Sequence, residues 1–338
     1  MLMLVGALLV AGNLDEIPIY RIPDDLENMG DGTHCARGTL EKAWTEESGA
    51  SAELVPNRAC KYSIRHWRKD RSDMAMCSHR QAENRPVLTL ALLYYKDGVF
   101  FKDQLSRWRS LPLHIRQQIS FLVVDDGSPH GEKAIDIYTD DGSINIIFTT
   151  ILADKDWNIG GARNLAFHIA QTEHVFVIDS DLLVPLELLE LGLKYTKEEL
   201  AINFNESSKK RSVFINFDRM FNNSGLHRPH PAAMLLSKTA YWVCGGCDED
   251  FVGHYGMTDP HFRWRSVKTG KVIVKDVLRV SSNPLVMMEA RSKLSIPRDA
   301  TTNIRLFREK IVGNLPWSNK YLRFPWKLES VFCLGRAR

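Results

Sequence analysis

Two aspartates one residue apart, Asp179 and Asp181, follow the apolar run Val-Phe-Val-Ile at 175–178. Such a run predicts a buried strand of a parallel sheet, which delivers whatever follows it to the carboxyl edge, where ligands of open α/β sheets bind. Two carboxylates at that edge favour a hard divalent cation, bound through oxygen and shared with a phosphate ligand. The alternative is a turn with solvated aspartates, because Asp is common in turns.

Another acid pair follows an earlier predicted strand. The apolar run at 119–124 leads directly into Asp125 and Asp126, followed by Gly-Ser-Pro, so these carboxylates should reach the same edge. An aspartate there can accept hydrogen bonds from a base N–H or a ribose hydroxyl. A plain β-turn accounts for the same residues, since Asp, Gly, Ser and Pro each favour turns.

Between the two acidic turns lies the segment Asn-Ile-Gly-Gly-Ala-Arg-Asn, residues 158–164. The paired glycines Gly160 and Gly161, at the start of a helix, leave backbone N–H groups for a ligand and allow it to approach closely. Arg163 falls in the first helical turn, where a cation opposes the helix dipole unless an anion is near, and this favours a phosphate-facing role. The segment is not G-x-G-x-x-G, so a Rossmann dehydrogenase is disfavoured.

The elements that must position these residues alternate along the chain. Strands followed by helices predict an α/β fold with a mostly parallel sheet flanked by helices. The strands are expected at 88–95, 119–124, 144–151, 174–178, 212–217 and 271–280, and the helices at 100–111, 161–171 and 185–195. A further apolar stretch covers 232–245, and the closing segment is expected to hold at most three turns and to wrap the main domain.

Taken in order, these motifs resemble the nucleotide-sugar half of family 2-like glycosyltransferases of the GT-A fold, a Rossmann-like arrangement. Further along, Gly-Gly-Cys-Asp-Glu-Asp-Phe at 245–251 is similar to the G-G-aromatic-D-E-x-F segment of that family. The stretch 253–265 takes the place of its E-D-x-x-apolar-x-x-R motif, a galactosyltransferase-type region. The resemblance extends over residues 86–290 and implies a nucleotide-sugar-dependent transferase of hexosyl or N-acetylhexosaminyl groups.

The resemblance implies donor-side roles for five matching residues. Asp125 and Asp126 would bind the nucleoside, expected to be uridine. Gly160, Gly161 and Arg163 would face the diphosphate.

It also implies roles at the metal and on the acceptor side. Asp179 would position the sugar-ribose and the metal, and Asp181 would be the more direct ligand of Mn²⁺ or Mg²⁺. Asp248 and Glu249 would contact the acceptor. Asp259, at the motif's spacing from its arginine, would be the general base of an inverting transfer to a hydroxyl.

Some residues depart from the family pattern. Thr258 replaces the motif's Glu, which leaves open a non-catalytic GT-A-like protein that binds nucleotide sugar or glycan. Cys247 replaces the aromatic residue, and with Cys244 it forms a C-x-x-C whose packing or disulfide role is favoured over zinc binding. A D-x-D phosphatase is the second alternative, but Leu183 stands where that class expects Thr or Val.

Four histidines are candidates for the parts of the site that remain unassigned. His254 and His261 flank the predicted base and could supply a third metal ligand. His227 and His230 lie beside prolines before the acceptor-side strand and could contact donor or acceptor.

Composition divides the 338 residues into three parts. Residues 1–83 form an apolar N-terminal segment and an arm or stem, 84–290 the GT-A domain, and 291–338 a basic, aromatic C-terminal extension. With 44% hydrophobic and 25% charged residues, the chain is that of a globular protein. The extension carries 11 Lys and Arg against 3 Asp and Glu, but no nucleic-acid-binding motif accompanies this charge, so nucleic acid is not expected.

The expected partners are a nucleotide-sugar donor and a glycan, glycolipid or glycoprotein acceptor. Six cysteines and the glycosylation sequons at Asn205 and Asn222 favour the secretory pathway, as Golgi lumen or membrane, with the cytoplasm as the alternative. The apolar run at 1–12 is too short for a membrane span and lacks the basic start of a signal peptide, although membrane association is possible.

Overall fold

The computed structural model describes residues 52–53, 86–205, 212–221, 226–268, 272–278, 285–287, 297–313, 315–318 and 320–335. Of the predicted N-terminal arm, only β1 (Ala52–Glu53) is described, and it pairs with β11 (Lys320–Tyr321). The N-terminal apolar run, the first three cysteines and the second sequon lie outside the described residues.

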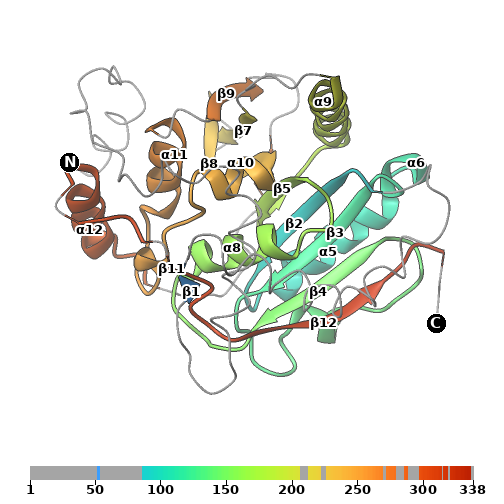
Figure 1. The fold of residues 1–338 in the computed structure, drawn as a ribbon. Helices are drawn as coiled ribbons and strands as arrows, with labels where there is room; N and C mark the ends of the chain where they lie inside the picture. Colours follow the sequence, from blue (N-terminus) through green and yellow to red (C-terminus); the bar gives the residue numbers. More distant parts are fainter. Residues whose placement is uncertain are drawn as a thin grey trace.

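One large mixed sheet forms the centre of the fold (Figure 1). Four of its seven neighbouring pairs are parallel, and β2 is paired in parallel with a strand on each side. The predicted α/β fold is therefore confirmed. In spatial order the strands are β12 (Trp326–Phe332), β4 (Ile146–Ile151), β3 (Ile119–Asp125), β2 (Leu88–Tyr94), β5 (His174–Asp179), β8 (Leu226–Ser237), β7 (Ser212–Phe221) and β9 (Val272–Leu278).

Helices cover both faces of this sheet, because the central strands are apolar on both sides. Side chains alternate along a strand, so Leu122 and Val124 pack into one core and Phe121 and Val123 into the other. The first core is closed by α8 (Ile159–Ile169), α10 (Lys238–Val243) and α11 (Thr258–Lys268). The second is closed by α5 (Gly98–Ser110), α6 (Leu113–Arg116), α7 (Ala134–Ile137) and α9 (Leu186–Asn205).

The apolar stretch predicted at 232–245 contains two elements. β8 ends at Ser237 and α10 begins at the next residue, Lys238. The side-chain oxygen of Ser237 accepts a hydrogen bond from the N–H of Ala240 at 3.0 Å, so this serine caps the helix and separates it from the strand.

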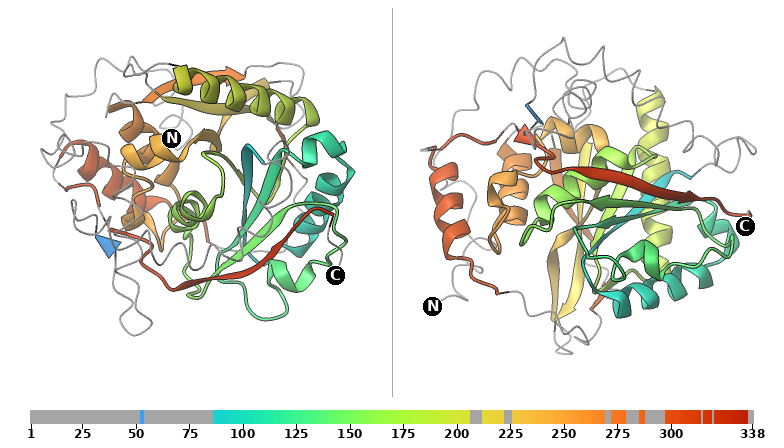
Figure 2. Two further views of the ribbon diagram at one scale, coloured as in Figure 1. Left: turned by 45° about the vertical axis from the view of Figure 1, so that its right-hand side comes forward. Right: turned by 90° about the horizontal axis from the view of Figure 1, so that it is seen from below.

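The expectation of at most three turns in the closing segment is wrong. The segment contains a helix, α12 (Thr301–Ile311), and β12, which pairs antiparallel with β4 at the edge of the main sheet (Figure 2). A short helical 3-10 turn, η4 (Glu249–Phe251), and a two-stranded pair of β6 (Leu182–Leu183) with β10 (Val286–Met287) complete the elements that bear on the site. Among the described helices, none is both long and apolar enough to cross a membrane.

Candidate active site

The two acidic turns share one edge of the sheet but face opposite layers. β2 pairs with β3 and with β5, and places Tyr94 beside Asp125 and Leu93 beside Asp179. Because neighbouring side chains on a strand point to opposite faces, Asp125 faces the layer of α5 and α7, and Asp179 the layer of α8 and α11. Acids therefore lie on both sides of the sheet at this edge.

Asp125 builds the first turn from a buried position. Its carboxylate accepts hydrogen bonds from the N–H groups of Ser128 and Ala134, both at 2.9 Å. Asp126 is half-buried and accepts from Nδ2 of Asn158 at 2.9 Å. Burial raises the pKa of Asp126 to about 7. Of the two predicted nucleoside ligands, Asp126 keeps more of its carboxylate available.

The loop after β4 closes against this turn. Gly127 adopts φ +83°, and a Cβ at this position would lie 2.9 Å from Cα of Asp154, so only glycine fits without strain. Asp154 accepts a hydrogen bond from the hydroxyl of Tyr95 at 2.9 Å and pairs with Nζ of Lys96 at 3.3 Å. The loops after β2, β3 and β4 are thereby joined at the strand edge.

The turn that carries Asp181 is held from the α5 layer by Gln104, a residue that the sequence analysis did not identify. Gln104 is buried, and its Nε2 donates to the carbonyl oxygens of Ser180 at 3.2 Å and Leu182 at 2.5 Å. The chain then enters β6, which is paired with β10. The turn between the two aspartates is thus fixed before and after Asp181.

The acid pair at this turn carries negative charge that its surroundings only partly balance. Burial, together with the nearby acids Asp181 and Asp259, raises the pKa of Asp179 to about 7 against the opposing effect of Arg163, 4.0 Å away. Burial also raises the pKa of Asp181, which has no ion pair among the described residues. A divalent cation would supply the missing positive charge.

The residues at the edge fit a cation that is shared with a ligand. The described residues contain no group of three or more His, Cys, Asp or Glu side chains that could hold a metal ion. Mg²⁺ and similar cations bind through one or two carboxylates when phosphate oxygens and water complete the coordination. Asp179 and Asp181 match that donor set.

One of the two histidine candidates for a third metal ligand, His261, lies in the protein core. His261 is fully buried in an aromatic cluster, so the hypothesis that it completes the metal site is wrong. Its ring lies against Phe251, Trp264, Phe307 and Trp317.

The other histidines are placed differently. His254 is exposed, and the side chain of His227 lies outside the described residues. His230 is buried, and its Nδ1 accepts from the N–H groups of Ala232 and Ala233 at 3.2 and 3.1 Å. Burial, reinforced by nearby arginines, lowers the pKa of His230 to about 3, so the ring is neutral.

The glycines at the start of α8 are packed closely by protein. A side chain at Gly160 would lie 3.1 Å from the methyl group of Thr258, and one at Gly161 would collide with the side chains of Asn158 and Phe324. Packing alone therefore requires small residues here. The predicted diphosphate contact stays a prediction that depends on the N–H groups of the first turn, which have no acceptor within the helix.

Arg163 connects the acid pair to the predicted base. It is fully buried, and its Nη1 donates to Oδ1 of Asp259 while Nη2 lies 4.0 Å from Oδ1 of Asp179. Asp259 lies in the first turn of α11, where the helix dipole favours a negative charge. The neighbouring Thr258 is buried with its methyl against Gly160, so this departure from the family motif occupies a packing position.

Asn164, at the end of the 158–164 segment, is a second residue that the sequence analysis did not identify. Its Oδ1 accepts from the hydroxyl of Tyr241 at 2.6 Å and from the N–H of Cys247 at 2.9 Å. Its Nδ2 donates to the carbonyl of Cys247 at 3.0 Å and to Oε1 of Glu249 at 2.7 Å. This amide joins α8 to the whole 241–249 segment. Cys247 and Cys244 are both buried thiols, so packing explains them.

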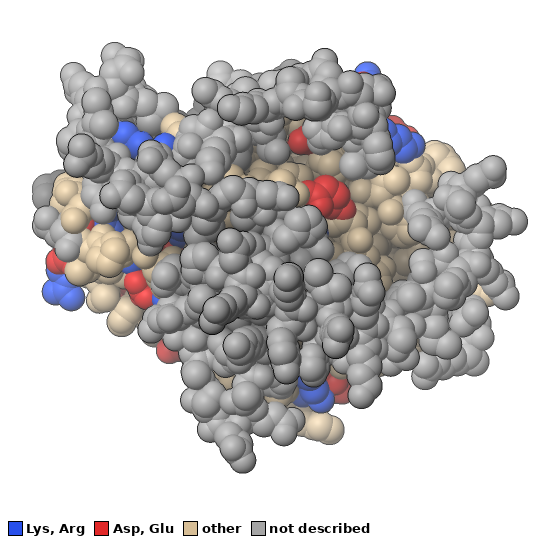
Figure 3. Space-filling model, in the orientation of Figure 1, with Lys and Arg blue, Asp and Glu red and all other residues tan. Residues whose placement is uncertain are grey.

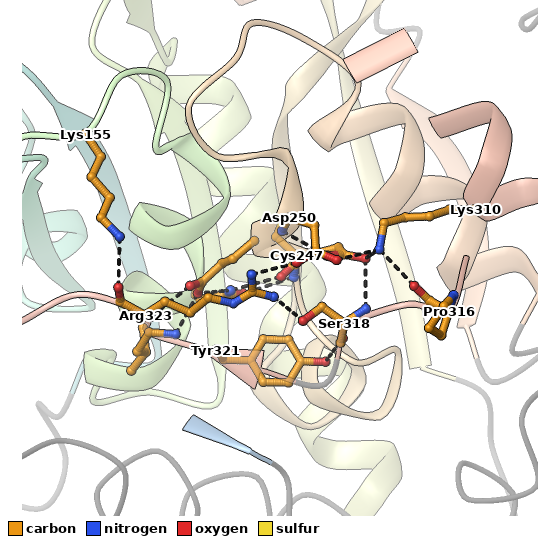
Figure 4. Close-up of polar contacts among 12 residues, drawn as sticks. Lys155, Cys247, Asp250, Lys310, Pro316, Ser318, Tyr321 and Arg323 are labelled. Atoms are coloured by element: carbon orange, nitrogen blue, oxygen red, sulfur yellow. Dashed lines mark hydrogen bonds and ion pairs between the residues drawn. The ribbon is translucent and has the colours of Figure 1, made fainter. Parts of the chain in front are cut away.

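Asp248 and Glu249, the predicted acceptor contacts, bind the C-terminal extension. Glu249 accepts from the N–H groups of Leu322 at 2.7 Å and Arg323 at 2.9 Å. Asp248 pairs with Nζ of Lys310 at 2.9 Å, and Lys310 also pairs with Asp250 (Figure 4). The acceptor role of the two acids stays a prediction.

The extension therefore uses part of its positive charge within the protein. Arg323 pairs with Asp250 at 2.6 Å, in the same cluster as Lys310 (Figure 4). On the face shown in Figure 3, the basic and acidic side chains of the described residues lie in small groups, and no large patch of one sign is seen among them.

Comparison with known proteins gives a family match. Residues 108–242, which include both acidic turns and the 158–164 segment, match the family model described as Glycosyl transferase family 2. No curated protein sequence matches the chain.

Three similar solved structures are distant from this chain in sequence. TarS residues 1–349 from S. aureus, in complex with UDP-GlcNAc, is 13% identical over 65% of this chain and 65% of that one, with a TM-score of 0.47. Mannosyltransferase PcManGT from Pyrobaculum calidifontis, in complex with GDP-Man and Mn²⁺, is 16% identical over 72% and 67%, with a TM-score of 0.42. The catalytic domain of Drosophila β1,4-galactosyltransferase 7, in complex with xylobiose, is 11% identical over 66% and 79%, with a TM-score of 0.39.

The chain spans 60–65% of the length of the TarS 1–349 structures that it matches. Residues 108–242 are thus similar to Glycosyl transferase family 2, and they contribute strands to the mixed α/β sheet of this chain.

Proposed function

We propose that this protein transfers a sugar from a nucleotide diphosphate sugar, in the first instance a UDP-sugar, to a hydroxyl group of a glycan, glycolipid or glycoprotein. The observation that carries the proposal is the meeting of Asp179, Arg163 and Asp259 beside Asp181 at one sheet edge, within or next to the segment that matches the family. Such a site needs an acid pair that can bind a cation and a separate carboxylate that can take a proton; Asp179 and Asp181 would supply the first, and Asp259 the second.

On the donor side, the chain's own residues would hold the nucleotide. Asp126 would accept a hydrogen bond from the base or the ribose, on the turn that Gly127 and Asn158 fix in place. Asp181, on the turn that Gln104 holds, would be the direct ligand of Mn²⁺ or Mg²⁺, with Asp179 beside it. When bound, the cation stabilises the negative charge that develops on the departing diphosphate.

On the acceptor side, Asp259 would act as the general base. Its carboxylate would accept the proton of the acceptor hydroxyl while that oxygen attacks the anomeric carbon. Arg163, which is fully buried, holds this carboxylate through their ion pair. Attack on the face opposite the leaving diphosphate would invert the anomeric centre.

A non-catalytic protein that binds nucleotide sugar is the second candidate. Thr258 is the observation that favours it, since a carboxylate is expected at this position and the buried threonine cannot supply one.

A screen of the full chain would test both candidates. UDP- and GDP-sugars would be offered with Mn²⁺, Mg²⁺ or a chelator and a set of glycan acceptors, with products read by mass spectrometry and nucleotide binding by calorimetry. We expect cation-dependent transfer that Asp259→Asn abolishes without loss of nucleotide binding, and that Asp181→Asn abolishes together with cation-dependent binding. Asp103→Asn, an exposed aspartate on α5, is the matched control.

Two outcomes would count against the leading proposal. Absence of both nucleotide binding and transfer with every donor would reject nucleotide-sugar chemistry altogether. Nucleotide binding without turnover, unchanged by Asp259→Asn, would favour the non-catalytic candidate.

We also propose a place in the secretory pathway, in the Golgi lumen or membrane. Cys333 is disulfide-bonded, and disulfides are typical of oxidising compartments. Enzymatic removal of N-glycans from the expressed protein would reveal glycosylation at Asn205 or Asn222 as a mobility shift, and an unglycosylated protein in a cytosolic fraction would oppose this placement.

A further inference from the structure

One face of α12 is buried although it carries two polar residues. Asn303, Phe307 and Lys310 are spaced by four and three residues, so they lie on one side of the helix, and all three are buried. Phe307 packs against His261 on α11, and Lys310 pairs with Asp248. This face docks α12 onto the segment that runs from η4 to α11.

Asn303 binds the backbone of that segment at three points. Its Nδ2 donates to the carbonyl oxygens of Phe251 at 2.9 Å, His254 at 2.7 Å and Gly256 at 2.8 Å. An amide nitrogen has only two hydrogens, so three carbonyls converge on one group. Three residues after the last of them comes Asp259, the proposed base.

The loop that Asn303 binds has an unusual backbone. Gly253, Gly256 and Met257 have φ values of +96°, +85° and +66°. For Met257 this left-handed conformation costs energy, and such conformations persist only where the surroundings hold them. Besides Asn303, the loop is held by the N–H of Gly253, which donates to the carbonyl of Asp156 at 2.9 Å, and by the ring of Tyr255, which packs against Trp157.

We infer that Asn303 is a positioning residue for the transfer reaction, because it fixes the loop that sets the place of Asp259. This inference rests on the proposed function. A general base must come within about 3 Å of the oxygen whose proton it removes, and a displacement of about 1 Å can lower the rate by about 100-fold. The C-terminal extension, through α12, is then part of the acceptor half of the site.

The test compares variants of the full chain on the same α12 face. Asn303→Asp keeps the shape but directs a carboxylate at three carbonyl oxygens, and Asn303→Ala removes the donor, so one of them serves if the other fails to fold. Phe307→Leu weakens docking without touching the loop, and Arg305→Ala changes an exposed residue of the same helix. For each variant, kcat and KM for transfer, the affinity for UDP with Mn²⁺, and Tm would be measured.

We expect the Asn303 variants to lower kcat by about 10- to 100-fold while UDP affinity is kept, since Asp126 and Asp181 are untouched. Phe307→Leu should lower Tm without this loss of kcat. The inference is overturned if folded Asn303 variants transfer at the wild-type rate, or if kcat follows Tm equally in all variants. Failure of wild-type protein to bind or transfer any donor would instead reject the proposed function.

Discussion

Acidic residues in two regions of this molecule have opposite surroundings. In the 248–250 segment, Asp248 is almost completely buried, and burial acts to raise its pKa, but Lys310 and Arg265 outweigh this effect and the pKa is lowered. At the sheet edge, the side chain of Asp179 is 30% exposed, yet the effect of burial prevails and the pKa is raised to about 7. The more deeply buried acid is therefore the one that ionises more readily.

The difference shows that partners, rather than depth, decide what a buried carboxylate does. Asp248 pairs with Lys310, and Glu249, whose pKa is raised by burial, accepts hydrogen bonds from backbone N–H groups of the C-terminal extension, so both acids hold the extension in place. Asp179 and Asp181 lie where the protein leaves negative charge incompletely balanced, as a site for a cation requires. Under the proposed function, the same residue type would stabilise the protein in one region and bind the cation in the other.

Removing the positive charge of Lys310, the partner of Asp248, should have the largest effect on stability. Lys310→Met would leave Asp248 buried without its main partner, which we expect to lower the free energy of unfolding by about 3–5 kcal/mol and Tm by about 10 °C. Lys102→Met, at an exposed position on α5, is the control. Thermal unfolding of the two variants checks this, and an equal, small loss in both would remove the contrast between the regions.

Glu249→Gln should have a smaller effect of the same kind. Glutamine keeps one oxygen acceptor, but its amide group would face a backbone N–H of Leu322 or Arg323, and we expect a loss of about 1–3 kcal/mol. Hydrogen exchange at these two amides should also become faster. Unchanged exchange would mean that Glu249 does not hold the extension.

The sequence was sufficient to predict those parts of the fold that depend on residues close together in the chain. The apolar runs located the central strands within about two residues, because buried parallel strands consist almost entirely of apolar residues. The positions of the acid pairs after β3 and β5 follow from those runs. The alternation of side chains could also have placed Asp125 and Asp179 on opposite faces, since each lies a fixed number of residues from a core position.

The remaining parts of the site depend on contacts that no local pattern reveals. Gln104 binds a turn 78 residues away, and Arg163 meets Asp259 across 96 residues. The docking face of α12 was missed because Asn303 and Lys310 interrupt the apolar period that predicts a buried helix face. Polar residues that are buried because of distant partners look like surface residues in a sequence.

Asp126, at the sheet edge, allows a test of the effect of burial through the pH dependence of stability. The pKa of Asp126 is raised by burial from 3.8 to about 7, so between these values the folded protein keeps a proton that the unfolded chain releases. Its stability contribution is present at low pH and is lost as pH rises through about 7. Asp126→Asn, which can still accept from Asn158, should therefore gain about 1 kcal/mol relative to wild type between pH 5 and pH 8. Tm measured across this range checks the sign, and a wild-type protein that gains on the variant as pH rises would contradict it.

The smallest effect on stability is expected at the residue with the largest expected effect on function. Asp181 lacks an ion pair among the described residues, and burial raises its pKa, so Asp181→Asn removes a poorly balanced charge and should change the free energy of unfolding by less than about 0.5 kcal/mol. The same change should lower transfer by about 100-fold or more, because the charge that binds the cation is gone. Tm and transfer would be measured for Asp181→Asn and for Glu249→Gln. We expect Glu249→Gln to have the lower Tm of the two variants. If Asp181→Asn unfolds the protein at a temperature well below wild type, the acid is structural, and the contrast between a binding region and a stabilising region does not hold.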